Sequence, residues 1–172
     1  EIYNLACPTS PKQYNDLPIE TLLTNSVGVY NVLVLAKRYK ARFLHLSTSA
    51  IYGDPKESGL IREDNWGNVN PIGPRSCYNE GKRFAESLTS NFHTKEVVDT
   101  KIARVFNTFG PRMKLDDGRM IPDFVVNALL NKPITVYGTE DEVGSYCYIE
   151  DMVEGVIRLM ASEINTPVNL GS

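Results

Sequence analysis

The chain has 172 residues, which is enough for one domain with a buried core, and its hydrophobic content of 42% and charged content of 23% are typical of a soluble globular protein. The net charge is −3 and no basic run is longer than two residues, so we expect neither a nucleic-acid partner nor an anionic membrane surface. The longest apolar helical stretch, residues 27–36, is judged too short and too polar to span a bilayer, so no membrane partner is expected.

The three cysteines are odd in number and form no CxxC pair, which favours reduced thiols in a cytoplasmic protein over a disulfide framework or a metal site. The chain begins with Glu1 rather than Met, inside an expected strand, and ends where another expected strand enters a loop. We therefore expect these residues to be a piece of a longer chain.

Short apolar strands alternate with longer amphipathic helices, a pattern typical of parallel βαβ units. Pro18 is expected in the first turn of the first helix, with Asp16 as its cap. Along the chain we predict a strand at 2–6, a helix at 18–39, a strand at 43–47, a long irregular loop at 52–75, a helix at 76–95, a strand at 101–106, a helix at 120–130, a strand at 134–137, a helix at 151–160 and a strand at 168–170.

These elements predict an α/β fold: an incomplete Rossmann-type, doubly wound parallel sheet with helices on both faces, and part of a small carboxyl-terminal substrate-binding region. We assign residues 1–112 to the carboxyl-terminal portion of the dinucleotide-binding domain and 113–172 to a mixed segment that contributes to the substrate-binding region.

Tyr78 and Lys82 are four residues apart on an expected helix, so both side chains lie on one face. A tyrosine hydroxyl titrates near pH 10 and is a poor base, but an ammonium one turn away favours the phenolate. Thr48 at one strand end and Asn107 at the next are expected to converge with this pair in one crevice at the carboxyl edge of the sheet. The sequence thus predicts oxidation of a hydroxyl.

Several stretches resemble the extended short-chain dehydrogenase/reductase family, and within it the UDP-glucuronate decarboxylase branch. The matching stretches are Asn4-Leu5-Ala6-Cys7-Pro8, Tyr52-Gly53-Asp54-Pro55, Trp66-Gly67-Asn68-Val69-Asn70-Pro71, Ser76-Cys77-Tyr78-Asn79-Glu80-Gly81-Lys82-Arg83 and Phe106-Asn107-Thr108-Phe109-Gly110-Pro111-Arg112. The resemblance covers essentially the whole chain and implies NAD as cofactor, a UDP-sugar as substrate and a homodimer.

The same resemblance implies a role for individual residues. Tyr78 would be the base, Lys82 would tune it and bind the nicotinamide ribose, and Thr48 would assist at the reacting hydroxyl. The implied cofactor-binding residues are Leu5, Ala6, Asn25, Ser47, Tyr78, Lys82 and Arg112, and the implied substrate-binding residues are Ser49, Asn107, Val136 and Tyr137. No metal ligand is implied. For Asn107 and Arg112, turn formation is the competing interpretation.

Three departures from the family pattern bear on function. The Gly-x-x-Gly-x-x-Gly turn that holds the dinucleotide phosphates is absent from these residues, so weak NAD binding is expected. Ala50 replaces the glutamate of the decarboxylases, which makes this stretch more like that of the 4-epimerases. Gly144 replaces an arginine that contacts the nucleotide phosphates in most of the family.

Three hypotheses follow. The leading one is NAD-dependent decarboxylation of UDP-glucuronate to UDP-xylose through a 4-keto intermediate. The second is a UDP-sugar 4-epimerase, which needs the same oxidation but no acid at position 50. The third is an inactive fragment or subunit that pairs with an active relative.

Overall fold

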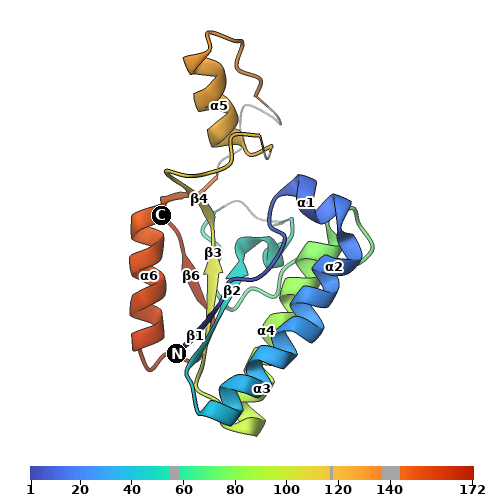
Figure 1. Ribbon diagram of the computed structural model, residues 1–172, viewed down its shortest axis with the longest axis vertical. Coiled ribbons are helices and arrows are strands. Elements are labelled where there is room, and N and C mark those ends of the chain that lie inside the picture. The colour runs from blue at the N-terminus through green and yellow to red at the C-terminus, as the bar shows by residue number, and fades with distance from the viewer. Residues whose placement is uncertain (55–58, 117, 137–143) are drawn as a thin grey trace.

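The computed structural model spans residues 1–172 and describes all of them except 55–58, 117 and 137–143. Its centre is a four-stranded sheet of order β1-β2-β3-β6 in which all neighbouring strands are parallel. The strands are β1 (Ile2–Asn4), β2 (Phe43–Thr48), β3 (Thr100–Val105) and β6 (Val168–Leu170). Helices cover both faces of this sheet (Figure 1), which confirms the predicted fold class.

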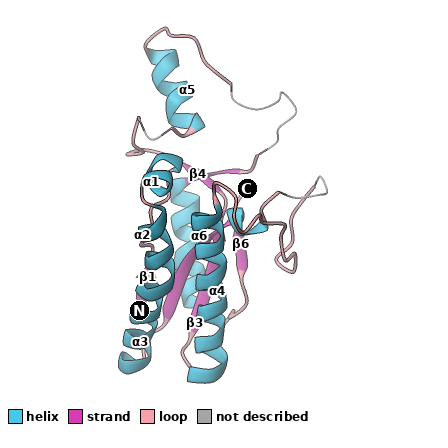
Figure 2. Cartoon of the chain, turned by 90° about the vertical axis from the view of Figure 1, so that its right-hand side faces the viewer, coloured by secondary structure: helices cyan, strands magenta, loops and turns pink. Residues whose placement is uncertain are grey.

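One face of the sheet is covered by α2 (Pro18–Leu23), a π-helical segment (Thr24–Gly28), α3 (Val29–Tyr39) and α4 (Ser76–Glu96). The other face is covered by α6 (Ile149–Ala161) (Figures 1 and 2). Strand β2 serves both sides because its side chains alternate: Phe43 packs into the core with α3 and α4, whereas Leu44 packs with α6. The sheet therefore separates two hydrophobic cores.

The first predicted helix differs from expectation in three ways. Residues 11–16 form a separate helix, α1 (Pro11–Asp16), whose N-cap is Ser10, so Asp16 is not a cap. Leu17 occupies the N-cap of α2 without a side-chain hydrogen bond. The π-helical segment then inserts one wider turn before α3.

The run from Pro18 to Tyr39 is 22 residues long and, by length and composition alone, apolar enough to cross a membrane. The judgement that residues 27–36 are too short considered only part of this helical run, and the expected absence of a membrane partner stays a prediction. Three of its apolar residues, Val29, Leu33 and Ala36, are fully buried against the sheet and α4.

The carboxyl-terminal third differs most from the prediction. Strands β4 (Asn107–Phe109) and β5 (Tyr146–Tyr148) form a separate parallel pair that was not predicted. Helix α5 (Met120–Leu129) projects away from the sheet (Figures 1 and 2). The predicted strand at 134–137 is wrong over 134–136, which have no regular structure, and Tyr137 lies outside the described residues.

The predicted irregular loop follows β2 and a short 3₁₀ turn (Ser49–Tyr52). Gly53 and Gly67 let two parts of this loop approach closely. A Cβ on Gly53 would lie 2.1 Å from the backbone oxygen of Asn68, and one on Gly67 would lie 2.5 Å from that of Ile51. Both glycines also have positive φ values, which other residues adopt only with backbone strain. Glycine at these two positions therefore allows the two parts of the loop to cross close to one another.

Candidate functional site

The predicted catalytic residues meet where the carboxyl end of β2 faces the first turns of α4. Thr48 ends β2, and its hydroxyl accepts a hydrogen bond from the Ala50 amide at 3.2 Å. Tyr78 lies in the first turn of α4, is buried, and its side chain is hydrogen-bonded to that of Thr48. Lys82 follows one turn later on the same face. The structure therefore brings Thr48, Tyr78 and Lys82 together.

The environment of Tyr78 favours its protonated form. Burial raises the pKa of Tyr78, and the hydrogen bond to Thr48 lowers it only in part. The negative charge of a Cys7 thiolate would raise the pKa further, whereas Arg119 and Arg75 lower it. The predicted net lowering of this pKa by Lys82 is thus not what the structure shows. The phenol is protonated at neutral pH, and additional positive charge beside it would favour the phenolate.

The Lys82 ammonium is directed to the backbone of β2. It donates a hydrogen bond to the Leu46 oxygen at 2.7 Å and is only 3% exposed. Burial lowers the pKa of Lys82, while the charges of Cys7 and Glu86 raise it. These contacts fix the side chain beside the strand that ends in Thr48.

The expected cofactor-binding residues Leu5, Ala6 and Asn25 flank this centre. Leu5 and Ala6 follow β1 and are exposed at the carboxyl edge of the sheet. Asn25 lies in the π-helical segment, fully buried, and its Nδ2 donates to the Thr21 oxygen at 2.9 Å and to the Cys7 sulfur at 3.0 Å. Its Oδ1 is buried without a hydrogen-bond partner among the described residues. A buried acceptor without a partner, next to Cys7 in the segment that follows β1, fits a ligand hydroxyl, such as that of a ribose.

Ser47 has a different place from the one expected. Its side chain is buried, and its hydroxyl donates to the Glu86 carboxylate, which Arg104 in turn holds. The hydroxyl is therefore engaged inside the protein, beneath the carboxyl edge, and its predicted contact with the cofactor stays a prediction.

The expected phosphate- and sugar-binding residues are more dispersed. Ser49 is half-buried in the 3₁₀ turn next to Thr48, while Asn107, Arg112 and Val136 are exposed. Among the described residues, no hydrogen bond joins these four side chains to Tyr78 or Lys82. Arg112 has a φ of 70°, which agrees with the competing interpretation that it forms a turn. Tyr137 lies outside the described residues.

The two substitutions noted in the sequence have local explanations. Ala50 packs against the cluster that contains Tyr78, so the position where the resemblance implies a glutamate presents only a methyl group to the candidate centre. At Gly144, an added Cβ would lie 2.9 Å from the Tyr146 ring, so the ring occupies space that a larger residue would need.

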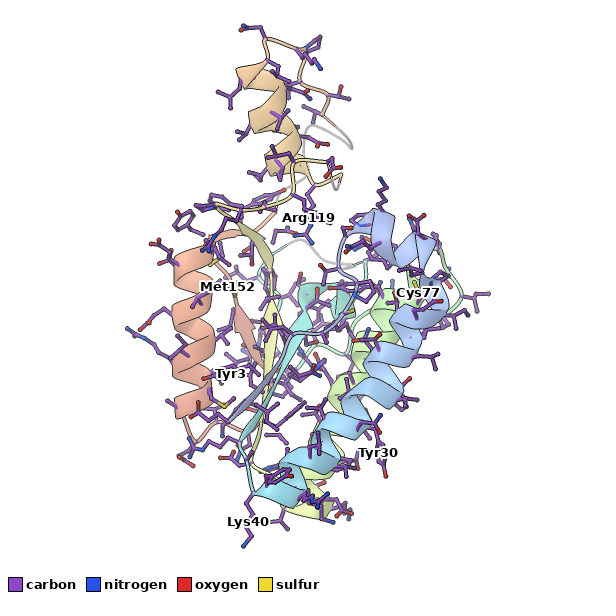
Figure 3. All side chains as sticks on the ribbon, in the orientation of Figure 1. Tyr3, Tyr30, Lys40, Cys77, Arg119 and Met152 are labelled. Carbon is purple, nitrogen blue, oxygen red and sulfur yellow. The ribbon has the colours of Figure 1, made fainter. Side chains whose placement is uncertain are left out.

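Sequence reasoning missed two contributors to the site. The Tyr14 ring of α1 stacks on Tyr78, with centroids 5.2 Å apart and an interplanar angle of 19°. Arg119, at the N-cap of α5, donates a hydrogen bond to the Thr9 hydroxyl at 3.0 Å and lies between α5 and the sheet edge (Figure 3). The Ser10-Pro11 pair is a helix-start signal that could have indicated α1, whereas nothing local in the sequence indicated Arg119.

A parallel sheet with a tyrosine–lysine pair and a threonine at its carboxyl edge defines a dinucleotide-dependent oxidoreductase-type centre. The model of the NAD dependent epimerase/dehydratase family matches residues 1–171. The chain belongs to this family.

The chain is 53% identical to UDP-glucuronic acid decarboxylase 4 of Arabidopsis thaliana and 49% identical to UDP-glucuronic acid decarboxylase 1 of Xenopus tropicalis, over all 172 residues. It spans 39% and 41% of their lengths. It also superposes with a TM-score of 0.81 on a variant of UDP-glucuronic acid 4-epimerase from Bacillus cereus, solved with UDP-4-deoxy-4-fluoro-glucuronic acid and NAD. That match has 26% identity and covers all of this chain and 54% of the epimerase.

Proposed function

We propose that this chain forms part of an enzyme that uses NAD to decarboxylate UDP-glucuronate to UDP-xylose through a 4-keto sugar. The observation that supports this most is the buried centre of Thr48, Tyr78 and Lys82, together with 53% identity over the whole chain to a UDP-glucuronic acid decarboxylase.

In this proposal, Tyr78 first loses its own proton to solvent, which positive charge beside it favours, and the phenolate then takes the proton of the sugar C4 hydroxyl. Thr48 donates a hydrogen bond that orients the sugar hydroxyl. NAD, when bound, would accept the hydride from the same carbon. Lys82 supplies positive charge beside the reacting groups, and Asn25 offers its unpaired Oδ1 to the nucleotide. A ketone at C4 makes the sugar carboxylate β to a carbonyl, so the electrons released with carbon dioxide have an acceptor. Tyr78 finally returns its proton when the ketone is reduced.

The test is an incubation of the intact protein with UDP-glucuronate and NAD, with the products identified by mass spectrometry. UDP-xylose or the 4-keto pentose is expected. Tyr78→Phe should lower the rate by about two to four orders of magnitude, because it removes the acid–base group. Tyr39→Phe, at a 69% exposed position on α3, is the matched control and should not change the rate. Absence of both products from the wild type would overturn the proposal.

A 4-epimerase is the second candidate, and Ala50 is the observation that favours it. The methyl group beside Tyr78 supplies no carboxylate for the ring chemistry. In the same incubation, an epimerised sugar that keeps its carboxylate would identify this activity. Gain of decarboxylation in Ala50→Glu would then show that position 50 decides between the two reactions.

We also propose that residues 1–172 alone hold NAD weakly, since they contain no Gly-x-x-Gly-x-x-Gly turn for its phosphates. Isothermal titration of this chain with NAD is the direct measurement. Micromolar affinity would contradict the proposal without affecting the proposed reaction.

The proposed assembly is a homodimer through α2, α3 and α4. Apolar side chains on these helices and on the π-helical segment between α2 and α3 are unusually exposed for a water-facing surface: Ile19 and Leu23 on α2 are 62% and 52% exposed, Val27 in the π-helical segment is 54% exposed, and Phe84 on α4 is 53% exposed. Phe84 is exposed whereas Phe92 on the same helix is 8% exposed, so the apolar residues of α4 are divided between core and surface. Light scattering should give a dimer that Val27→Arg dissociates; a wild-type monomer at high concentration would refute this.

A further inference from the structure

Two of the stretches that carry the family resemblance meet in the structure. Trp66 begins one of them, and Arg83 ends the other on α4. Arg83 donates through Nη1 to the backbone oxygen of Trp66 at 2.7 Å and to that of Ile51 at 3.0 Å. One side chain of α4 therefore holds two separate parts of the chain that follows β2.

The two oxygens that accept these bonds lie where the long loop crosses the 3₁₀ turn. Gly67 approaches the same Ile51 oxygen, and the Asn68 amide donates to the Tyr52 oxygen at 2.8 Å. Ile51 and Tyr52 are each 2% exposed, whereas the Trp66 ring is 87% exposed. The crossing therefore engages the backbone of Trp66 rather than burying its ring, and Arg83 fastens both sides of it to α4.

The turn that Arg83 holds also carries the groups that face Tyr78. Thr48 is the N-cap of this turn and accepts a hydrogen bond from the Ala50 amide at 3.2 Å. The Thr48 side chain is hydrogen-bonded to that of Tyr78, and Ala50 packs against the cluster that contains Tyr78. The turn thus meets α4 at two places: at Tyr78 through Thr48 and Ala50, and at Arg83 through the Ile51 oxygen.

A guanidinium is well suited to hold two carbonyl oxygens, because hydrogen bonds from a charged donor are stronger than those between neutral groups. The Arg83 Nε lies 3.7 Å from a carboxylate oxygen of Glu80, three residues earlier on α4, which helps to orient the guanidinium. The Arg83 side chain is 37% exposed, so water weakens each bond in part. We therefore expect loss of Arg83 to loosen the turn and the loop more than the cores on either side of the sheet.

We propose that Arg83 is a positioning residue for the candidate centre: by bonding the Ile51 and Trp66 oxygens, it fixes the turn that begins at Thr48 against α4 and so keeps the Thr48 hydroxyl on Tyr78. This rests on the proposed role of Thr48 and Tyr78 in the reaction. Arg83 acts through the turn and not on the substrate. The consequence is that its loss leaves the catalytic groups present but less well aligned.

The first measurement is amide hydrogen exchange in the intact protein without substrate. Arg83→Met keeps an aliphatic side chain and removes the donors. The amides of Ala50, Gly53 and Asn68 are bonded within the turn or across the loop, and they should exchange about tenfold faster in this variant. Unchanged exchange in β2 and β3 would show that the variant is folded. Arg83→Gln takes the place of Arg83→Met if the latter does not fold.

The second measurement follows the Tyr78 hydroxyl by the ¹³Cζ resonance of labelled tyrosine, assigned with Tyr78→Phe. Thr48→Val gives the shift that accompanies loss of the Thr48 hydroxyl, and Arg83→Met should move the resonance in the same direction. Arg83→Lys should stay near the wild type, because both bonds come from one nitrogen and an ammonium ion has three donors. Arg158→Met is the control for both measurements and should change neither, since Arg158 on α6 pairs with Glu154 of its own helix.

Turnover of UDP-glucuronate with NAD supplies the third measurement. Arg83→Met should lower kcat about tenfold and change KM by less than about twofold, because a misplaced orienting group slows the bound complex more than it weakens binding. Arg83→Lys should restore kcat. Wild-type exchange rates, a wild-type Tyr78 resonance or a wild-type kcat in Arg83→Met would each overturn the proposal, as would an Arg83→Lys variant as defective as Arg83→Met. An inactive wild type would refute the proposed reaction, whereas the exchange rates and the Tyr78 resonance would still decide whether Arg83 positions Thr48.

Discussion

His45 is a fully buried histidine on β2 whose two ring nitrogens have no hydrogen-bond partner among the described residues. It lies on the same side of the strand as Phe43, facing α3 and α4. Burial, and next the charge of Lys82, lower the pKa of His45 well below its usual value of about 6.5. We predict that this ring makes the stability of the protein depend on pH.

The sign follows from proton uptake. Below pH 6.5 the unfolded chain protonates His45 while the folded chain does not, so the unfolded state binds more protons and the free energy of unfolding falls as the pH falls. Each pH unit costs roughly 1.4 kcal/mol while the folded ring remains neutral, which gives about 2 kcal/mol between pH 6.5 and 5. Above pH 7 this contribution is constant.

His45→Leu should abolish this dependence. Leucine has a similar volume and removes an unpaired buried polar group, which is worth about 1–3 kcal/mol in favour of the variant. Urea unfolding at pH 5, 6 and 7 would measure both effects, with the variant gaining further on the wild type as the pH falls. His93→Leu is the control: the His93 ring is half-buried and bonded to the Val98 oxygen at 3.0 Å. Parallel stability curves for wild type and His45→Leu between pH 5 and 7 would refute the reasoning.

Two other predictions concern the thiols and the crossing of the loop. Iodoacetamide should modify half-buried Cys7 before the buried Cys77 and Cys147, which peptide mass mapping would show; simultaneous labelling would contradict the packing seen here. Gly67→Ala should lower the free energy of unfolding by about 1–3 kcal/mol more than Gly118→Ala, because both glycines have positive φ but only Gly67 faces a backbone oxygen at 2.5 Å. If thermal or urea unfolding showed the same loss of unfolding free energy in Gly67→Ala and Gly118→Ala, the loop would have to move aside for the added methyl group, and the prediction would be wrong.

The sequence predicted those elements whose signal is local. Four of the five predicted strands and the helix of α4 are present, because apolar runs and four-residue periodicity determine them before any partner is known. The four-residue spacing of Tyr78 and Lys82 is also a signal that is local in the sequence. Since a helix fixes the relative direction of residues four apart, this pairing could be predicted as soon as the helix was.

What the sequence could not predict depends on partners far along the chain. Strands β4 and β5 are three residues each and exist only because they pair with one another across 36 intervening positions. The strand predicted at 134–137 had the right composition but finds no neighbour over its described residues. Ser47 was assigned to the cofactor by the family resemblance, and its bond to Glu86 depends on how α4 lies on β2.

The pKa of Tyr78 was predicted in the wrong direction for a physical reason that bears on the mechanism. The helix spacing was correct, but it says nothing about how deeply the phenol is buried or where the ammonium points. Burial turned out to be the larger effect on Tyr78, and Lys82 is directed to the Leu46 oxygen.

The centre is therefore held protonated at rest, and its reactivity depends on how much positive charge gathers around the Tyr78 hydroxyl. Arg75 and Arg119 already act in that direction. A carboxylate at position 50 would oppose both, because a negative charge beside the hydroxyl raises its pKa. Ala50 thus removes an acid–base group but also a charge that disfavours the phenolate, and Ala50→Glu should slow proton removal from the sugar even where it permits decarboxylation. The measurement is the rate at which the 4-keto sugar first forms in a burst experiment. A slower burst in Ala50→Glu than in the wild type is expected, and a faster burst would show that the added carboxylate does not oppose proton removal.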